Sequence, residues 1–251
     1  MKSNALSHSR SRTRLIVNSG LMIAISIVLK LLFEMYIPLG GFPALRINLT
    51  SLPIMLSGIL LGPLSGFIVG FISDLLCFVI KPNGPFFIGF TLASGLIGML
   101  PGLLWIFLEK SDISHLEWFN LVLVVLSLIV LWTAGLFTFQ DGTVYYDGAA
   151  IHPLLMVLFI LLMAIFIIFP VLAVRRSSLQ GTYRSDYVLF IVSVTQLVVS
   201  IVLNTLFLKI LYGSAIAVLL PGRIITNIFL IPLYTIALTL LLKILPKFVK
   251  N

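Results

Sequence analysis

The sequence predicts an all-α fold, a polytopic bundle of transmembrane helices, and three observations predict it. Of the 251 residues, 60% are hydrophobic and 10% are charged, whereas about a quarter of a soluble domain is charged. The mean hydropathy is +1.20. The apolar residues form long continuous runs, which favour helices over a membrane barrel of alternating segments. A soluble enzyme, a disordered chain and, with Cys77 as the single cysteine, a disulfide scaffold are excluded.

Eight apolar windows predict membrane spans, because a helix needs roughly 20 apolar residues to cross about 30 Å of hydrocarbon. Gly62-Pro63 separates the second span from the third, since proline lacks an amide proton and suits the first turn of a new helix. The first window follows basic residues but has no small-residue cleavage site, so we expect a retained span rather than a signal peptide. The expected spans are 15–36, 49–61, 63–80, 82–108, 117–138, 151–174, 187–208 and 224–242.

Basic residues orient these spans, because cytoplasmic loops are enriched in Lys and Arg. With both termini in the cytoplasm, 11 of the 16 Lys and Arg residues lie on the cytoplasmic side. The net charge of +8 fits such a membrane surface better than nucleic-acid binding. The sequence therefore predicts a multi-pass protein of the cell membrane, in contact with lipid. The eleven residues are Lys2, Arg10, Arg12, Arg14, Lys110, Arg175, Arg176, Arg184, Lys243, Lys247 and Lys250.

Seven further charged residues lie near the outer face, and most of them are positive. Lys30 and Glu34 are four residues apart on the first span, so they share a face on which they can pair. Intramembrane charge is costly and usually faces a cavity or a partner. The excess of positive charge predicts an outward-facing pocket for an anion, and the competing interpretation is ordinary loop charges with snorkelling side chains. The seven are Lys30, Glu34, Arg46, Asp74, Lys81, Lys209 and Arg223.

Glycines recur at every fourth position from Gly58 to Gly70, and Asp74 continues the series. Gly66, Gly70 and Asp74 therefore share one stripe of the third span. Small residues at this spacing let helices approach closely, so we expect a packing face that ends in a carboxylate and forms the floor of the pocket. The fourth span carries a similar set, interpreted as helix packing: Gly95, Gly98 and Gly102.

Three segments rich in glycine and proline lie on the outer side, at 38–43, 81–89 and 212–223. Such backbone cannot face lipid at depth, and broken segments mark binding sites in transporters. Aromatic residues accompany them, Phe90 and Tyr212 included. Aromatic residues near an interface are often belt anchors, but planar rings beside cations also suit a flat anionic heterocycle.

The motifs of several chemistries are missing from the sequence. It has no G-x-x-x-x-G-K-[ST] phosphate loop, no H-E-x-x-H or Cys/His cluster and no G-x-S-x-G elbow. We therefore expect no catalytic residue, no metal site and no cofactor. The energy for any pumping would come from an ion gradient or from another subunit.

Three ordered blocks of residues stand out along the sequence. The first is Gly20-Leu-Met-Ile-Ala24 in the first span. The second runs from Arg46 through Leu52-Pro53-Ile54, the glycine series and Ser73-Asp74-Leu75 to Asn83-Gly84-Pro85-Phe86-Phe87 and Gly89-Phe90-Thr91-Leu92. The third is Leu203-Asn204-Thr205, Tyr212-Gly213, Pro221, Arg223, Asn227 and Pro232. Together these blocks resemble the S components of energy-coupling factor (ECF) vitamin transporters, and in particular the folate type.

The resemblance implies a single membrane domain over 1–251. Its six-helix core is 15–108 and 187–246, and the two-helix hairpin 109–186 is an insertion that the family's usual short connection lacks. It also implies a subunit that captures a vitamin-like small molecule, with folate expected, for ATP-driven import. The implied partners are a transmembrane T subunit, which would meet Gly20 and Ala24, and two ATPase subunits.

The resemblance also implies roles for residues of the outer pocket. Arg46 and Arg223 would contact carboxylates or ring acceptors. Asp74 would accept hydrogen bonds from a heterocycle or hold an arginine, and Asn204 would make a two-way amide contact. The expected substrate-binding residues are Arg46, Asp74, Phe90, Asn204, Tyr212 and Arg223.

Two other functions stay open at this point. One is a secondary carrier for a small anion, driven by protons through Asp74. The other is a membrane enzyme acting on lipid, or a scaffold, although such enzymes usually display clustered His, Asp or Ser at an interface.

Overall fold

The computed structural model describes residues 2–39, 42–82, 85–111, 137–140, 143–146, 149–151, 185–212 and 216–244. Within these ranges, the side chains of 2–12, 35–47, 111, 137–151, 185, 212, 216–222, 224, 225 and 228 are not described. Contacts divide the chain into two units. Unit 1 comprises Met1–Met35, Arg46–Asp112 and Pro246–Asn251, and unit 2 comprises Tyr36–Leu45 and Ile113–Leu245.

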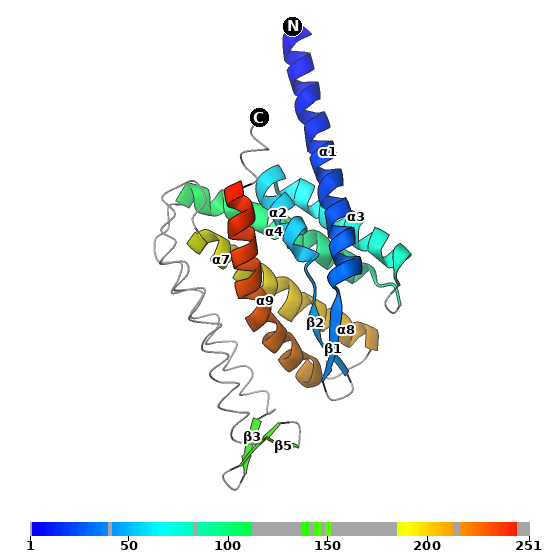
Figure 1. Ribbon diagram of the computed structural model, residues 1–251, viewed down its shortest axis with the longest axis vertical. Helices are drawn as coiled ribbons and strands as arrows, with labels where there is room; N and C mark the ends of the chain where they lie inside the picture. Colours follow the sequence, from blue (N-terminus) through cyan, green and yellow to red (C-terminus); the bar gives the residue numbers. More distant parts are fainter. Residues whose placement is uncertain are drawn as a thin grey trace. The chain divides into compact units, whose positions relative to one another are not determined.

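The described residues of unit 1 form four helices: α1 (Lys2–Phe33), α2 (Ser51–Leu61), α3 (Pro63–Ile80) and α4 (Ile88–Ser111) (Figure 1). Asn48 Oδ1 accepts a hydrogen bond from the Thr50 backbone N–H at 2.8 Å, which satisfies a donor just before α2 begins. Gly62 separates α2 from α3 with a φ of 101°, and Pro63 opens α3. This backbone angle favours glycine, so the predicted break at Gly62-Pro63 is confirmed.

Close backbone contact holds α2, α3 and α4 together. A Cβ atom on Gly98 of α4 would lie 2.0 Å from the carbonyl oxygen of Gly66 in α3, and one on Gly58 of α2 would lie 1.9 Å from that of Gly98. No side chain fits at these distances, so only glycine permits the approach. The predicted packing role of the glycine series is confirmed, and its partner is the glycine set of the fourth span.

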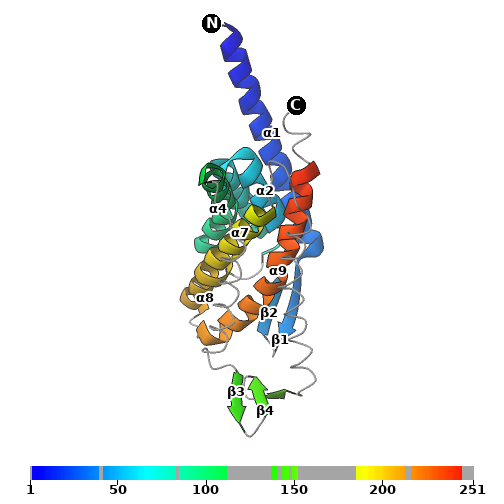
Figure 2. The ribbon, with the colours of Figure 1, turned by 90° about the vertical axis from the view of Figure 1, so that its left-hand side faces the viewer.

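In the described part of unit 2, one long broken helix packs against a neighbouring helix. The helix runs through α7 (Ser185–Thr195), the π-helix η1 (Gln196–Leu203) and α8 (Asn204–Tyr212). The neighbour is α9 (Ile216–Ile244), which packs against all three segments (Figure 2). The side chains of Val188, Ile191, Val192, Val199 and Leu238 are almost completely buried in this packing.

Short strands are also present, and the sequence analysis missed them. β1 (Met35–Leu39) pairs with β2 (Phe42–Ile47). In unit 2, β3 (Phe137–Gln140), β4 (Thr143–Tyr146) and β5 (Ala149–Ile151) form an antiparallel sheet. Phe137 lies opposite Tyr146 and Val144 opposite Ile151. The fold is therefore a helical membrane architecture with small hairpins rather than helices alone.

Several span boundaries also differ from the prediction. The first helix ends at Phe33, not at residue 36, because Pro38 disfavours helix in the residue before it and its ring would clash with the carbonyl four residues back. Residues 137 and 138, predicted at the end of a span, lie in β3. Charge-free composition marked these residues as membrane-spanning, but composition does not distinguish a helix end from a short apolar strand.

Four helical stretches are long and apolar enough to cross a membrane within the described part of the chain: Thr13–Phe33, Pro63–Ile80, Ile88–Lys110 and Asp186–Leu211. Two shorter apolar helices are Ser51–Leu61 and Phe229–Ile244. The predicted spans 117–138 and 151–174 lie largely outside the described residues. The eight-span count and the inserted hairpin 109–186 therefore stay predictions.

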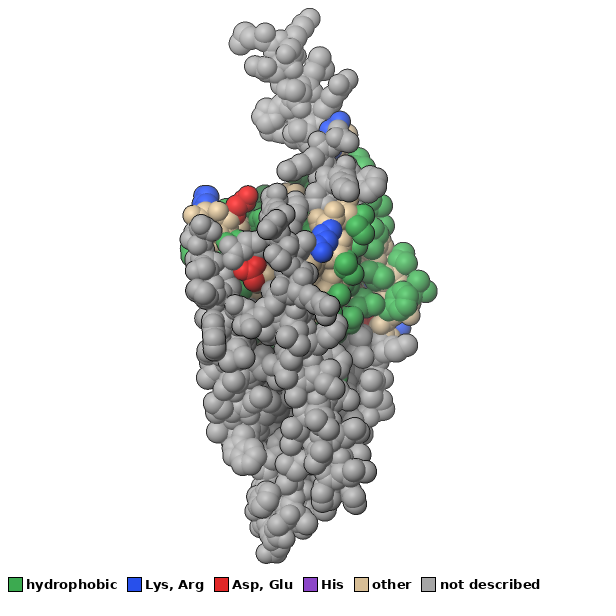
Figure 3. All heavy atoms as spheres, turned by 60° about the vertical axis from the view of Figure 1, so that its left-hand side comes forward, with side chains coloured by type: hydrophobic (Ala, Val, Ile, Leu, Met, Phe, Trp, Pro, Cys, Tyr) green, Lys and Arg blue, Asp and Glu red, His purple; other side chains and the backbone are tan. Residues whose placement is uncertain are grey.

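Large hydrophobic side chains gather on the surface of the described helices (Figure 3). On α3, Leu64 and Val79 are 73% and 77% exposed, and Ile68, Ile72 and Leu76 lie on the same exposed side. A soluble monomer rarely exposes a contiguous apolar surface of this extent. The surface is the one expected of helices in contact with lipid.

Candidate ligand-binding site

The close contact of α3 with α4 places Asp74 beside Thr91. Gly66 meets Gly98, and one turn further along α3 a Cβ atom on Gly70 would lie 2.1 Å from the Ser94 carbonyl oxygen. One more turn brings Asp74 to α4, where Thr91 Oγ1 donates a hydrogen bond to Asp74 Oδ2 at 3.0 Å. The glycine register therefore fixes the position of the carboxylate.

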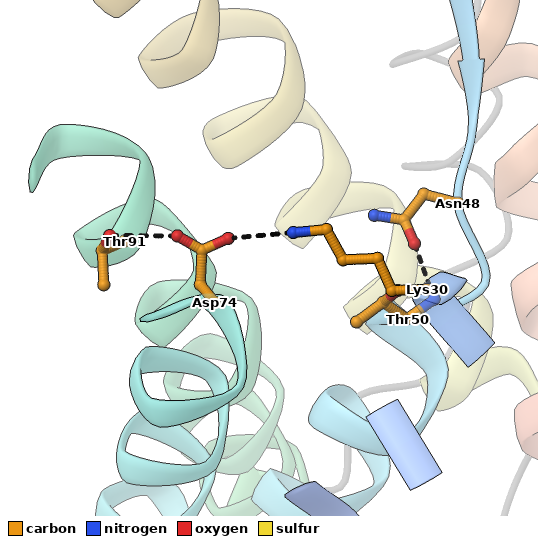
Figure 4. A network of polar contacts seen from close by, with 5 residues as sticks. All are labelled: Lys30, Asn48, Thr50, Asp74 and Thr91. Carbon is orange, nitrogen blue, oxygen red and sulfur yellow. Dashed lines mark hydrogen bonds and ion pairs between the residues drawn. The ribbon is translucent and has the colours of Figure 1, made fainter. Parts of the chain in front are cut away.

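The second carboxylate oxygen of Asp74 faces α1. Lys30 Nζ lies 3.6 Å from Asp74 Oδ1, and the two side chains are 11% and 23% exposed (Figure 4). The structure thus gives Lys30 an ion-pair partner on α3, which spacing along α1 did not predict. The carboxylate is held between α1 and α4 with charge compensation on one side and a hydroxyl donor on the other.

A second polar group lies in unit 2, where η1 faces α9. In η1 the Asn204 backbone N–H donates to the Val199 carbonyl, five residues back. The Ser200 carbonyl, which an α-helix would offer to Asn204, accepts a hydrogen bond from Arg223 Nη1 at 2.8 Å. The π-helix therefore presents backbone to a guanidinium of the neighbouring helix, and π-helical turns are frequent at functional sites.

Asn227 completes this group from the next turn of α9. Its Nδ2 donates to Ser200 Oγ at 2.9 Å and to the Arg223 carbonyl at 2.7 Å. Asn227 is 2% exposed. Among the residues that the structure describes, its Oδ1 has no hydrogen-bond partner, and the same holds for Asn204 Oδ1. The contact of η1 and α8 with α9 thus contains amide oxygens that are ready to accept hydrogen bonds.

The six predicted substrate-binding residues fall into three groups: two in unit 1, two in unit 2 and two whose side chains are not described. Asp74 and Phe90 belong to unit 1, whereas Asn204 and Arg223 belong to unit 2. Phe90 is half-buried in α4, with its ring 5.6 Å from that of Phe87 in an edge-on arrangement at 69°. The side chains of the remaining two, Arg46 and Tyr212, lie outside the described residues. A pocket shared by all six stays a prediction.

Sequence reasoning missed four residues of these polar groups, namely Lys30 as the partner of Asp74, Thr91, Ser200 and Asn227. Each makes its contact across two helices. Spacing within a single helix therefore carried no signal for these contacts, although Thr91 lay in the second block of resemblance and Asn227 in the third.

Gly20 and Ala24, the predicted partner-binding residues, are both exposed on α1. A Cβ atom on Gly20 would have nothing within 4 Å, and 17% of the Thr13–Phe33 stretch is buried. This face of α1 is therefore unoccupied within unit 1.

Comparison with known proteins places the chain in a family. Residues 10–168 match the family model described as ECF-type riboflavin transporter, S component. This match covers more than half of the sequence. The chain belongs to this family. The expectation of an ECF S component is thereby confirmed, and the family is one of transport proteins rather than enzymes.

Two named relatives resemble the chain. It is 37% identical over 78 residues to the folate transporter FolT of Clostridium novyi (strain NT), an alignment that covers 31% of this chain and 45% of FolT. The chain thus spans less than half the length of this curated relative. The crystal structure of FolT bound with folic acid is similar with a TM-score of 0.54 at 18% identity, over 91% of this chain and 94% of that one. This second likeness shows the fold.

Proposed function

We propose that the S component binds folate, or a closely related anion with a pterin ring, at the outer face of the cell membrane. The observation that carries this proposal is the 37% identity to FolT over 78 residues, and the fold of a FolT structure agrees with it. The charge excess near the outer face also suits folate, which carries two carboxylates.

The proposed contacts divide between the two ends of folate. Arg46 and Arg223 bind its carboxylates, since a guanidinium presents several donors in a fork that matches carboxylate oxygens. The rings of Phe90 and Tyr212 stack on its aromatic groups. Asp74, held by Lys30 and Thr91, and Asn204 bind polar edges of the heterocycle.

Riboflavin is the second candidate ligand, because the family model that matches the chain is described by riboflavin transport. Both vitamins carry a flat heterocycle, but riboflavin has no carboxylate. The predicted excess of cations near the outer face therefore favours folate over riboflavin.

Titration of the detergent-purified chain with folic acid and with riboflavin tests the proposal. We expect folate to bind more tightly, and Arg46→Ala, Arg223→Ala and Asp74→Asn each to weaken folate binding about tenfold or more, the effect of losing a charged hydrogen bond. Lys243→Ala, at an exposed lysine near the end of α9, is the matched control. Unchanged folate affinity in all three variants rejects the proposed contacts, and preferential riboflavin binding rejects folate as the ligand.

We also propose that the exposed face of α1 at Gly20 and Ala24 binds the T subunit. Two ATPases complete this importer, and both termini of its S component lie in the cytoplasm. Small residues allow a partner helix to approach closely. Gly20→Leu with Ala24→Leu is expected to abolish co-purification with the T subunit and leave folate binding intact. Retained co-purification would contradict this surface. Folate uptake that requires the ATPases would also exclude a proton-driven carrier.

A further inference from the structure

At the contact between η1–α8 and α9, the described residues provide no donor for one buried acceptor. Asn227 is 2% exposed, and its Oδ1 has no hydrogen-bond partner among the described residues. A buried polar group without a partner costs about 1–3 kcal/mol, and lipid around a helix supplies no donor to relieve that cost. The position calls for a donor that the described chain does not provide.

The orientation of the Asn227 amide is fixed by its neighbours. Its Nδ2 lies 2.7 Å from the Arg223 carbonyl oxygen, and a carbonyl can only accept a hydrogen bond. Turning the amide over would set Oδ1 against that carbonyl oxygen. The unpaired atom is therefore the acceptor, and its partner must be an N–H or O–H group.

Asn204 supplies a second acceptor next to the same serine. Ser200 Oγ accepts the hydrogen bond from Asn227 Nδ2, and Asn204 follows Ser200 by four residues, which brings it to the same face of the helix. Asn204 Oδ1 is also buried without a partner in the described part of the chain. Asn204, four residues after Ser200, and Asn227, which is hydrogen-bonded to Ser200, thus both present acceptors at this helix contact.

We propose that Asn227 and Asn204 bind the donor edge of the substrate's heterocycle, an amino group beside a ring N–H. This inference rests on the proposed function and extends it to Asn227, which would determine specificity. The pterin ring of folate has such an edge, with two adjacent donors. The flavin ring has a single N–H between two carbonyl oxygens, and those oxygens would face the asparagine acceptors without a hydrogen bond. The pair of asparagines therefore selects pterins over flavins.

Pterin and lumazine provide the sharpest test, because they differ in having an amino group or a carbonyl oxygen at the same ring carbon. We expect the detergent-purified wild-type chain to bind pterin at least about tenfold more tightly than lumazine, since the lumazine oxygen leaves an acceptor unpaired. This comparison requires no variant. Equal affinity for the two rings would overturn the inference.

Variants at the two asparagines locate the preference. Asn227→Leu is expected to weaken pterin binding about tenfold, leave lumazine binding nearly unchanged and so remove the preference. Asn204→Leu, at a less buried position, is expected to act in the same direction and serves if Asn227→Leu does not fold. Thr235→Val is the matched control, because Thr235 is equally buried in α9 and its hydroxyl donates within its own helix to the Ile231 carbonyl.

The outcomes separate this inference from the proposed function. Two outcomes overturn the inference alone: the chain binds folate but does not prefer pterin over lumazine, or both asparagine variants keep that preference. In either case water would satisfy the Oδ1 atoms of Asn204 and Asn227. Absence of folate binding to the wild-type chain overturns both.

Discussion

Two helix contacts in this S component are formed by different kinds of residue. Where α3 meets α4, glycines bring the backbones together, and a Cβ atom on Gly98 would lie 2.0 Å from the Gly66 carbonyl oxygen. Where η1 and α8 meet α9, the contact runs through serine, asparagine and arginine, and two amide oxygens lack partners among the described residues. The first contact has no room for another group, whereas the second contains acceptors that the described residues leave without a hydrogen bond. Close backbone packing and polar side-chain contact thus occur between different helix pairs of the same chain.

The largest expected effect comes from adding a methyl group to the glycine contact. Gly98→Ala forces α3 and α4 apart, because the methyl group would overlap the Gly66 carbonyl oxygen. We expect a loss of about 3 kcal/mol, the upper part of the range for overpacked cores, seen as a lower thermal midpoint in detergent. Gly20→Ala is the control, since its new methyl group meets nothing within 4 Å. Equal thermal midpoints for the two variants would contradict the account of this contact.

Removing Lys30 is expected to have the next largest effect. Lys30→Met leaves the Asp74 carboxylate without its cation, and we expect a loss of about 2 kcal/mol, below the value for a fully buried pair because Asp74 is 23% exposed. Adding Asp74→Asn should restore part of the loss, since the uncompensated charge is then gone. Lys110→Met, at an exposed lysine of the same unit, is expected to leave the thermal midpoint unchanged. A double variant no more stable than Lys30→Met would show that the pair contributes little.

Thr91→Val should give the smallest of these effects. It removes the hydroxyl that donates to Asp74 Oδ2 and keeps the shape of the side chain. One hydrogen bond contributes about 1 kcal/mol, which denaturant or thermal titration of the purified chain can resolve. A loss as large as that of Gly98→Ala would mean that Thr91 has a packing role beyond this bond.

The sequence predicted most of the helices and both glycine sets of the close contact, but not that the two sets meet each other. Long charge-free runs identified α1, α3 and α4, and Gly62-Pro63 identified the break before α3. The fourfold spacing placed Gly66, Gly70 and Asp74 on one stripe, because this regularity is a property of a single helix. The short strands were missed since apolar residues such as those of β3 suit a helix end equally well.

The contacts between helices could not be predicted in the same way. Lys30 and Asp74 meet because of how α1 packs on α3, and the pairing of Asp74 with Thr91 depends on the register of α3 against α4. The π-helix at Gln196–Leu203 has an apolar composition that an α-helix shares. The packing of the helices determines which polar groups pair with each other. A sequence pattern describes only one helix at a time, so it could not predict these pairs.

The central claim is that this S component captures a pterin-containing anion, and the ligand that accompanies the purified chain tests it most directly. Small molecules released from the detergent-purified protein can be identified by mass spectrometry. The account predicts folate or a close pterin derivative, and less of it per mole of protein from the Asn227→Leu variant under the same purification. Riboflavin as the released molecule would contradict the claim.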